Sequence, residues 1–250
     1  QAGSSPENID GRDVTLSIRR DVQNVLETEL IDGIERYGAK SGEAIVMNPA
    51  TGKILGMASF PHYAPKYFYK YEQDLYRNPS VAALYEPGST FKPITVAAGI
   101  DTGTITPETK CPRCDEPKKI GKYTIRTWNN EYNEDVSMKD ALAKSDNVAM
   151  VYIAEEVGAD IFRDYLKAFG FGAATTDELQ EDINTPFPEK WGPIEVATRS
   201  FGQGISLTSL QLMRAIAAIA NHGVMMQPSV IESFQDPISG EKIPVKPKEI

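Results

Sequence analysis

The spacing of hydrophobic residues changes twice near the start of the chain. Residues 13–18 (DVTLSI) alternate between apolar and polar side chains, which predicts a short strand. Residues 19–38 carry apolar side chains at helical spacing, and Gly38 is a suitable end for that helix. Its apolar stripe comprises Val22, Val25, Leu26, Leu30, Ile31 and Ile34. Residues 43–60 contain two apolar runs around the turn NPATG, which predicts a β-hairpin.

Helical spacing dominates the rest of the chain. Residues 89–100 predict a helix, and SMKD at 137–140 resembles a capping box that starts another. The sequence SDN at 145–147 interrupts this run before two further helices, VAMVYIAEEVG and residues 160–169. A last helix at 208–223 begins with a Thr-x-x-Gln box and is apolar nearly all round, which predicts that it is buried.

The remaining segments predict connections rather than regular elements. Residues 62–80 are polar and rich in tyrosine, and residues 101–135 are rich in Pro, Gly and charge. The tail ends in IPVKPKEI, in which we see no closing element. A strand, a helix and a hairpin followed by a helical middle predict an α/β (α+β) domain with a helical lobe.

Charge and composition narrow the possible partners. The formal net charge of −9 and the isoelectric point near 4.9 argue against a nucleic-acid partner, which requires a basic face. No run of about 18 apolar residues is present to span a membrane. The chain starts at Gln1 without an initiator methionine, and both ends look cut, so we expect targeting signals outside it. We interpret residues 1–12 as a linker from an N-terminal region.

The two cysteines, Cys111 and Cys114, form the sequence CPRC. A zinc ribbon needs four ligands, and the histidines, His62 and His222, are isolated in the sequence. We therefore favour a loop-closing disulfide, or two reduced thiols at a turn, over a zinc site. Cysteine usage leaves the cellular compartment open.

Ser89 and Lys92 form a Ser-x-x-Lys pattern directly after a Pro-Gly turn. Positions i and i+3 of a helix share a face, so the lysine amine can reach the serine hydroxyl and activate it as a nucleophile. The lysine acts as a base only if burial or a neighbouring cation lowers its pKa. The pattern also occurs at chance frequency, as SGEK from Ser239 to Lys242 shows; we interpret that copy as a solvated hairpin.

The sequence SDN adds a second set of polar groups. A hydroxyl at Ser145 can relay a proton, and Asn147 can donate to a substrate amide, if this loop faces Ser89. The alternative is a helix junction, because Ser, Asp and Asn all favour caps and turns. In the order SxxK then SxN, the two motifs match penicillin-binding proteins and class A β-lactamases.

Longer segments make the resemblance specific. GSTFKP, SDN and FGQGISLTSLQLMRAIAAIANHGVMMQP resemble the transpeptidase domain of class B penicillin-binding proteins. RDVTLSIRRDVQNVLETEL, GEAIVMNPATGKILGMASFP and KYTIRTWN are also similar to this family, so that the likeness runs from about residue 10 to residue 235. The resemblance implies the fold shared with serine β-lactamases, a helical lobe beside an antiparallel sheet, with residues 13–250 forming a partial domain.

The resemblance also implies roles for individual residues. Ser89 attacks the penultimate D-Ala carbonyl of a peptidoglycan stem peptide, and its backbone amide supplies half of the oxyanion hole. Lys92 accepts the proton of Ser89, Ser145 passes a proton to the leaving D-Ala, and Asn147 holds the donor peptide. β-Lactam antibiotics mimic the donor. No metal or organic cofactor is implied; a glycosyltransferase of the elongation or division machinery is the implied partner, with the catalytic domain outside the bacterial cell membrane.

One family motif is missing at its expected place. The Lys-Thr/Ser-Gly triplet should follow the GQG segment, but the sole match is Lys40-Ser41-Gly42, where the first strand of the hairpin begins. We therefore expect a truncated sheet rather than a degenerate homologue, and little or no activity from these 250 residues. The same truncation predicts an exposed apolar sheet edge. A β-lactam sensor or a serine β-lactamase is the alternative function.

Overall fold

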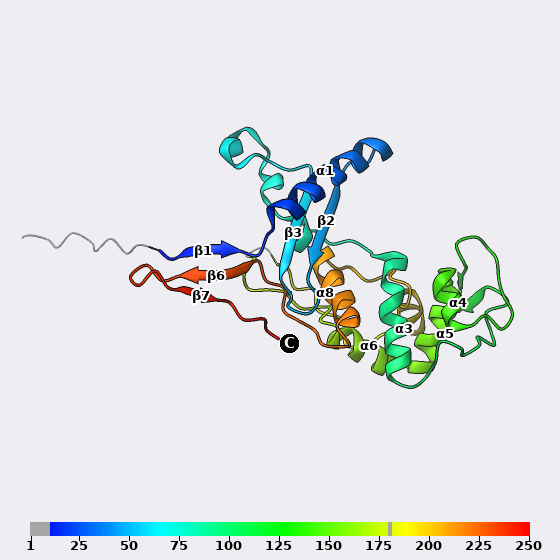
Figure 1. Ribbon diagram of the computed structural model, residues 1–250. Coiled ribbons are helices and arrows are strands. Elements are labelled where there is room, and N and C mark those ends of the chain that lie inside the picture. Colours follow the sequence, from blue (N-terminus) through cyan, green and yellow to red (C-terminus); the bar gives the residue numbers. More distant parts are fainter. Residues whose placement is uncertain (1–10, 180–181) are drawn as a thin grey trace, which may run out of the picture.

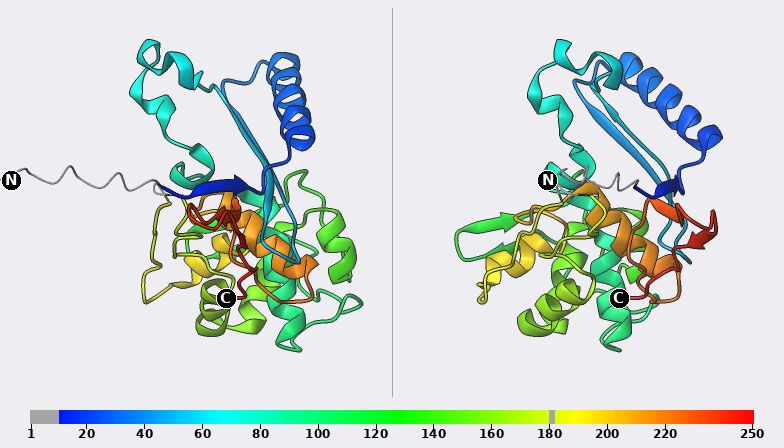
Figure 2. Two further views of the ribbon diagram at one scale, coloured as in Figure 1. Left: turned by 60° about the vertical axis from the view of Figure 1, so that its left-hand side comes forward. Right: turned by 90° about the vertical axis from the view of Figure 1, so that its left-hand side faces the viewer.

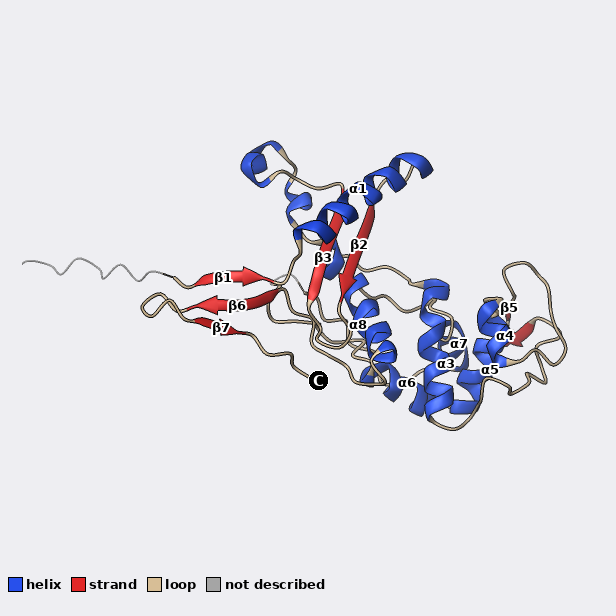
Figure 3. Ribbon diagram, in the orientation of Figure 1, coloured by secondary structure: helices blue, strands red, loops and turns tan. Residues whose placement is uncertain are grey.

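The computed structural model describes residues 11–179 and 182–250, and Figure 1 shows its three parts. Helices gather in one lobe, a helix and a β-hairpin stand against it, and a three-stranded sheet extends on the other side. The strands form small antiparallel sheets (Figure 3), which agrees with the mixed α/β class and the antiparallel pairing predicted from the sequence. Most of the predicted linker, residues 1–10, lies outside the described residues.

The predicted N-terminal elements are confirmed. Strand β1 (Asp13–Leu16) leads into helix α1 (Arg20–Tyr37), which ends at Gly38 with the left-handed φ of 62° that glycine favours. Strands β2 (Gly42–Met47) and β3 (Ile54–Phe60) form the expected hairpin, which α1 packs against. Within the described residues the outer edge of β2 has no strand partner, but the residues of β2 are half-buried rather than exposed, so the expected exposed apolar edge stays a prediction.

The tail forms strands that the sequence prediction missed. Strand β6 (Ile231–Gln235) pairs with β1, and β7 (Lys242–Pro244) pairs with β6. Their connection contains Ser239, whose amide and hydroxyl both donate to the Asp236 carboxylate. The second Ser-x-x-Lys match is therefore the exposed hairpin turn that we inferred.

Helix α3 (Lys92–Asp101) packs against other helices of the helical lobe, which Figure 2 shows from two further directions. Its other helices are α4 (Met138–Ala143), α5 (Asn147–Val157), α6 (Ala159–Ala168), α7 (Pro193–Arg199) and α8 (Ser209–Ala220). A continuous core joins these helices, with Phe91, Ile94, Met150, Ile153, Phe162 and Leu166 at its centre. Both predicted caps are present: Ser137 accepts the amide of Asp140, and Thr208 forms a reciprocal box with Gln211.

Four sequence expectations need correction. The region expected to be irregular contains a hairpin of β4 (Lys118–Ile120) and β5 (Tyr123–Ile125). The Cys111–Cys114 disulfide, which precedes this hairpin in the sequence, is by contrast one of the two states favoured for these cysteines. The polar connection holds η1 (Pro65–Lys70), η2 (Gln73–Tyr76) and α2 (Pro79–Ala82). Helix α7 was not predicted. Helix α8 is buried on one face only, with Ile219 exposed on the other.

Candidate functional site

Ser89 lies in a tight turn rather than in the α-helix that we predicted. The turn is the 3₁₀ segment η3 (Gly88–Phe91), and α3 follows it directly from Lys92. Residues i and i+3 eclipse one another in 3₁₀ geometry, so Ser89 and Lys92 share one side of the chain. Ser89 is exposed, and its hydroxyl makes no hydrogen bond within the described part of the chain. A reactant can therefore approach this hydroxyl from solvent.

The GQG segment holds this turn through backbone contacts. Tyr85 and Leu207 exchange two backbone hydrogen bonds of 3.0 and 3.1 Å, and the amide of Gly88 donates to the carbonyl of Gly202 at 2.9 Å. One turn further along α3, the Thr95 hydroxyl donates to the Ser200 carbonyl at 2.7 Å. We call residues 199–208 the strap, because they secure the segment that carries Ser89.

Gly202 is the point of closest approach between strap and turn. It has a φ of +78°, and a Cβ atom at this position would lie 2.1 Å from the carbonyl oxygen of Gly88. A distance below 3.0 Å to backbone requires the chain to move. Glycine is thus needed here both for its backbone conformation and for its missing side chain.

The SDN sequence is the junction of two helices, and the geometry explains each of its residues. The amide of Ser145 donates to the Leu142 carbonyl at 3.1 Å, and the amide of Asp146 donates to the Ala141 carbonyl at 2.8 Å. These bonds form a Schellman motif at the end of α4, which requires a left-handed residue where Ser145 lies. Ser145 accordingly has a φ of 57°, an uncommon value for a residue with a Cβ atom.

Lys92 and Ser145 are brought together by this junction. The Lys92 Nζ atom donates to the Ser145 carbonyl at 2.6 Å and to the Ser145 hydroxyl at 2.9 Å. The lysine is only 1% exposed, and burial lowers its pKa from 10.5 to about 8, although the Asp146 carboxylate acts in the opposite direction. A lysine amine with this pKa can both accept and return a proton near neutral pH.

Asn147 is the first residue of α5 and lies on the same junction. Its side-chain amide donates to the Arg126 carbonyl at 2.8 Å, which anchors the KYTIRTWN segment beside the SDN loop. An amide group carries two N–H donors, so this contact leaves one for another acceptor. The assignment of Asn147 to substrate binding stays a prediction.

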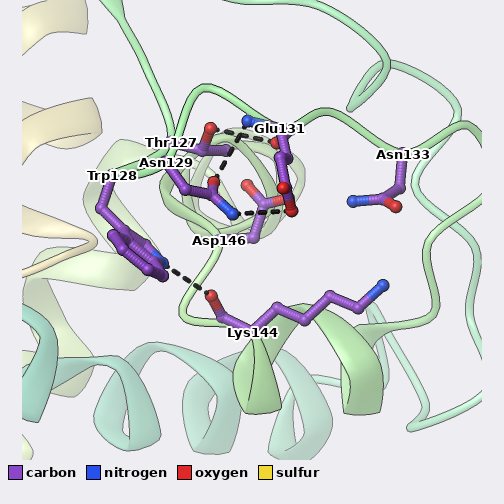
Figure 4. A pocket seen from close by; sticks show the side chains of 7 residues that line it. All are labelled: Thr127, Trp128, Asn129, Glu131, Asn133, Lys144 and Asp146. Atoms are coloured by element: carbon purple, nitrogen blue, oxygen red, sulfur yellow. Dashed lines mark hydrogen bonds between the residues drawn. The ribbon is translucent and has the colours of Figure 1, made fainter.

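A small cavity borders the junction on the side of the anchored segment. It has a volume of about 160 Å³ and is lined by Thr127, Trp128, Asn129, Glu131, Asn133, Lys144 and Asp146 (Figure 4). Trp128 is 74% exposed, and its ring nitrogen donates to the Lys144 carbonyl at 3.3 Å. Neither Trp128 nor Asp146 was predicted from the sequence as a site residue. The position of Asp146 between Ser145 and Asn147 in the SDN motif could have indicated it.

Neither a metal site nor a membrane-spanning helix is found among the described residues. No group of three or more His, Cys, Asp or Glu side chains there is arranged to hold a metal ion. In the same part of the chain, no helix is long and apolar enough to cross a bilayer.

The class of protein follows from comparison with known sequences. The profile of the penicillin binding protein transpeptidase domain matches residues 42–250, and the chain belongs to this family. The resemblance inferred from SxxK, SDN and the GQG segment is thereby confirmed.

Several relatives carry specific names. The chain is 32% identical to stage V sporulation protein D of Bacillus subtilis, covering 94% of this chain and 37% of that protein. It is 35% identical to a probable peptidoglycan D,D-transpeptidase FtsI of Caulobacter vibrioides, covering 86% and 36% respectively. For the peptidoglycan D,D-transpeptidase FtsI of Escherichia coli the identity is 30%, covering 96% and 40%. The chain thus spans less than half the length of these relatives.

The contact at Gly202 predicts a large loss of stability on substitution. Gly202→Ala should lower the free energy of unfolding by about 2–4 kcal/mol, because it combines an unfavourable φ with overpacking. Gly103 is the matched control, since its φ is +71° but a Cβ atom there would meet nothing within 4 Å. Gly103→Ala should cost only about 1 kcal/mol. Urea unfolding measures both values, and equal losses would contradict the close approach.

The backbone of Ser145 predicts an unusual order of stabilities. Ser145→Gly and Ser145→Ala both remove the hydroxyl, but only glycine also relieves the left-handed backbone. The glycine variant should be more stable than the alanine variant by about 1 kcal/mol. Thermal or urea unfolding provides the comparison. If alanine proved as stable as glycine, Ser145 would not hold the conformation described above.

The pKa of Lys92 predicts a pH dependence of stability. The folded protein releases the Lys92 proton near pH 8, whereas the unfolded chain keeps it up to about pH 10.5. The free energy of unfolding should therefore rise between these pH values, by at most about 3 kcal/mol, relative to a Lys92→Met variant. Urea titrations of both proteins across this window measure the difference. A constant difference would show that Lys92 is not desolvated by folding.

Proposed function

We propose that this chain is the Ser89-bearing part of a peptidoglycan D,D-transpeptidase, in the class B group of penicillin-binding proteins. The single observation that carries the proposal is the buried Lys92 amine, which contacts Ser145 and lies three residues from the exposed Ser89. The names of the relatives and the family match support the same reaction class.

The reaction has two steps on this site. Ser89 Oγ attacks the penultimate D-Ala carbonyl while its proton passes to the neutral Lys92 amine, directly or through the Ser145 hydroxyl. The peptide bond to the terminal D-Ala breaks, and the proton returns through Ser145 to the leaving amine. An amine of a second stem peptide then attacks the acyl-enzyme carbonyl. The new peptide bond is the crosslink, and the ester bond to Ser89 breaks. The Ser89 amide stabilises the oxyanion in both steps.

Asn147 and the Lys-Thr/Ser-Gly triplet concern the proposed binding of the substrate. Asn147 retains one amide N–H for the donor peptide. The family resemblance assigns the substrate carboxylate to a Lys-Thr/Ser-Gly strand, and the match within these 250 residues is Lys40-Ser41-Gly42, upstream of Ser89. We propose β-lactams as donor mimics. A glycosyltransferase of the elongation or division machinery remains the proposed protein partner.

An extracytoplasmic location at the bacterial cell membrane is part of the proposal. The Cys111–Cys114 disulfide supports it, because disulfides persist in oxidising compartments. The formal net charge of −9 argues against nucleic acid as the partner.

Labelling with a fluorescent penicillin tests the proposal. The reagent is applied to this chain and to the same chain extended by whatever coding sequence follows in its gene. The extended protein should form a long-lived adduct on Ser89, whereas this chain should react at least about 10²-fold more slowly, because an oxyanion donor and the carboxylate-binding strand are lacking. Ser89→Ala should abolish labelling, and Ser239→Ala, in the exposed second Ser-x-x-Lys match, is the control.

The possible outcomes separate the functions. Labelling that persists in Ser89→Ala, or no labelling of the extended protein, would overturn the proposal. Rapid loss of the adduct would indicate a β-lactamase. A stable adduct without crosslinking of a lipid II-derived polymer would indicate a sensor.

A further inference from the structure

Trp128 presents an aromatic ring to solvent beside the SDN junction. Its side chain is 74% exposed, and the indole N–H donates to the Lys144 carbonyl at 3.3 Å. Trp128 belongs to neither core cluster of the described residues, whereas the other tryptophan, Trp191, packs against one. The ring is therefore held by its polar edge, and its apolar faces are available to stack on a ligand.

The loop that carries Trp128 is braced by its own hydrogen bonds. The Thr127 hydroxyl donates to the Glu131 carbonyl at 3.0 Å. The side-chain oxygen of Asn129 accepts the Glu131 amide at 3.1 Å, and its side-chain amide donates to the Glu131 carboxylate at 2.8 Å. Because these bonds already fix the loop, binding of a ligand would order few further groups.

The cavity beside this ring offers several groups that donate or accept hydrogen bonds. In the view of Figure 4, Trp128 lies at one end of the cavity and Asn133 at the other, with the Lys144 side chain along one side. The side chains of Asn133 and Lys144 make no hydrogen bond or ion pair within the described part of the chain. The volume of about 160 Å³ equals that of about five molecules of liquid water, so a ring-sized group fits but a stretch of peptide does not.

The chemistry of the lining selects one class of ligand. An inorganic anion is disfavoured, because the carboxylates of Glu131 and Asp146 outnumber the amine of Lys144. A metal ion is disfavoured too, because Asp146 Oδ1 already accepts two backbone amides and the described residues hold no group of three metal-binding side chains. An apolar ligand would leave the polar lining without partners. A neutral ring with several hydroxyl groups fits, because hydroxyls both donate and accept and the C–H face of such a ring can lie on an indole.

The cavity and the proposed catalytic site share the SDN junction. Lys144 and Asp146 line the cavity, and the residue between them, Ser145, bonds to Lys92 Nζ at 2.6 and 2.9 Å. The side chain of Asn147 anchors the start of the cavity loop by donating to its backbone at 2.8 Å. One short segment of chain thus borders both the cavity and the groups assigned to the donor peptide.

We propose that this cavity is a saccharide subsite that takes one ring of the peptidoglycan glycan strand. The ring stacks on Trp128, and its hydroxyl groups bond to Asn133 and Lys144. The assignment to peptidoglycan rests on the proposed function, because the stem peptides on which Ser89 acts are attached to sugars of that strand. The subsite holds the glycan while Asn147 holds the peptide, and binding at this remote point helps to orient the bond that Ser89 attacks.

An NMR titration of this chain tests the subsite without any reaction. The indole ¹H–¹⁵N signals of both tryptophans are recorded, and the Trp128 signal is assigned by its loss in Trp128→Phe. The probe is a soluble glycan strand from which an amidase has removed the stem peptides. It should shift the Trp128 signal and leave the Trp191 signal in place, and an unmoved Trp128 signal at saturating glycan would overturn the proposal.

Two substitutions locate the binding. Trp128→Ala should weaken glycan binding about tenfold, because it removes the stacking surface. Asn133→Ala should also weaken it, because the amide that it removes bonds to no other side chain or backbone group in the described structure. Tyr37→Ala is the matched control, since Tyr37 is an aromatic residue, 79% exposed, at the end of α1. Isothermal titration calorimetry measures all three affinities, and an unchanged affinity in Trp128→Ala would contradict the stacking.

Other ligands identify the class and the source of the occupant. Free stem pentapeptide is the peptide without its sugar, and maltotetraose is a neutral glycan from another source. Binding of the pentapeptide at Trp128 in place of the glycan would overturn the saccharide class. Binding of maltotetraose as tightly as the glycan strand would overturn the assignment to peptidoglycan.

The penicillin labelling described above separates this inference from the proposed function. Glycan binding by this chain, together with no acylation of Ser89 in the extended protein, would mean that the subsite exists while the proposed reaction fails. Acylation of Ser89 without glycan binding would overturn the subsite and leave the reaction in place.

Discussion

The arrangement of the site depends on where the buried Lys92 amine finds its hydrogen-bond acceptors. A lysine that is 1% exposed must be bonded to polar groups, and the Ser145 carbonyl and hydroxyl provide them at 2.6 and 2.9 Å. These acceptors lie on the junction of α4 and α5, more than fifty residues along the chain. The desolvation of one amine therefore links α3 to the loop that must face Ser89, and it also lowers the lysine pKa into the range useful for a base.

The strap, residues 199–208, supplies the second constraint, on the other side of Ser89. It bonds to the backbone at Tyr85 and Gly88 and to the side chain of Thr95, so both ends of the turn that carries Ser89 are held. Because most of these contacts are backbone to backbone, they set position without adding a reactive group. The GQG segment was the most specific part of the family resemblance, although no acid, base or nucleophile is assigned to it. Its role in positioning the Ser89 turn accounts for this.

Local signals were sufficient for part of this structure. Helix α1, the NPATG hairpin and the Thr208 box depend on residues close in sequence, and each was predicted correctly. The predicted apolar stripe of α1 was wrong at Val25, which is exposed. Strand β6 was missed because its partner, β1, lies at the opposite end of the chain. The motif residues were predicted from their pattern, but the bond from Lys92 to Ser145 and the burial of Asp146 arise only from tertiary packing.

The site also concentrates features that oppose stability. Ser145 holds a left-handed backbone, and Lys92 and Asp146 are buried ionisable groups. Each would be replaced in a sequence selected for stability alone: by glycine, by an apolar side chain, or by a neutral cap. Their presence together, within two short motifs held by an extensive core, agrees with the reactive centre proposed above. The surrounding helices therefore do more than form a scaffold, because their packing free energy maintains a conformation that the motifs would not adopt alone.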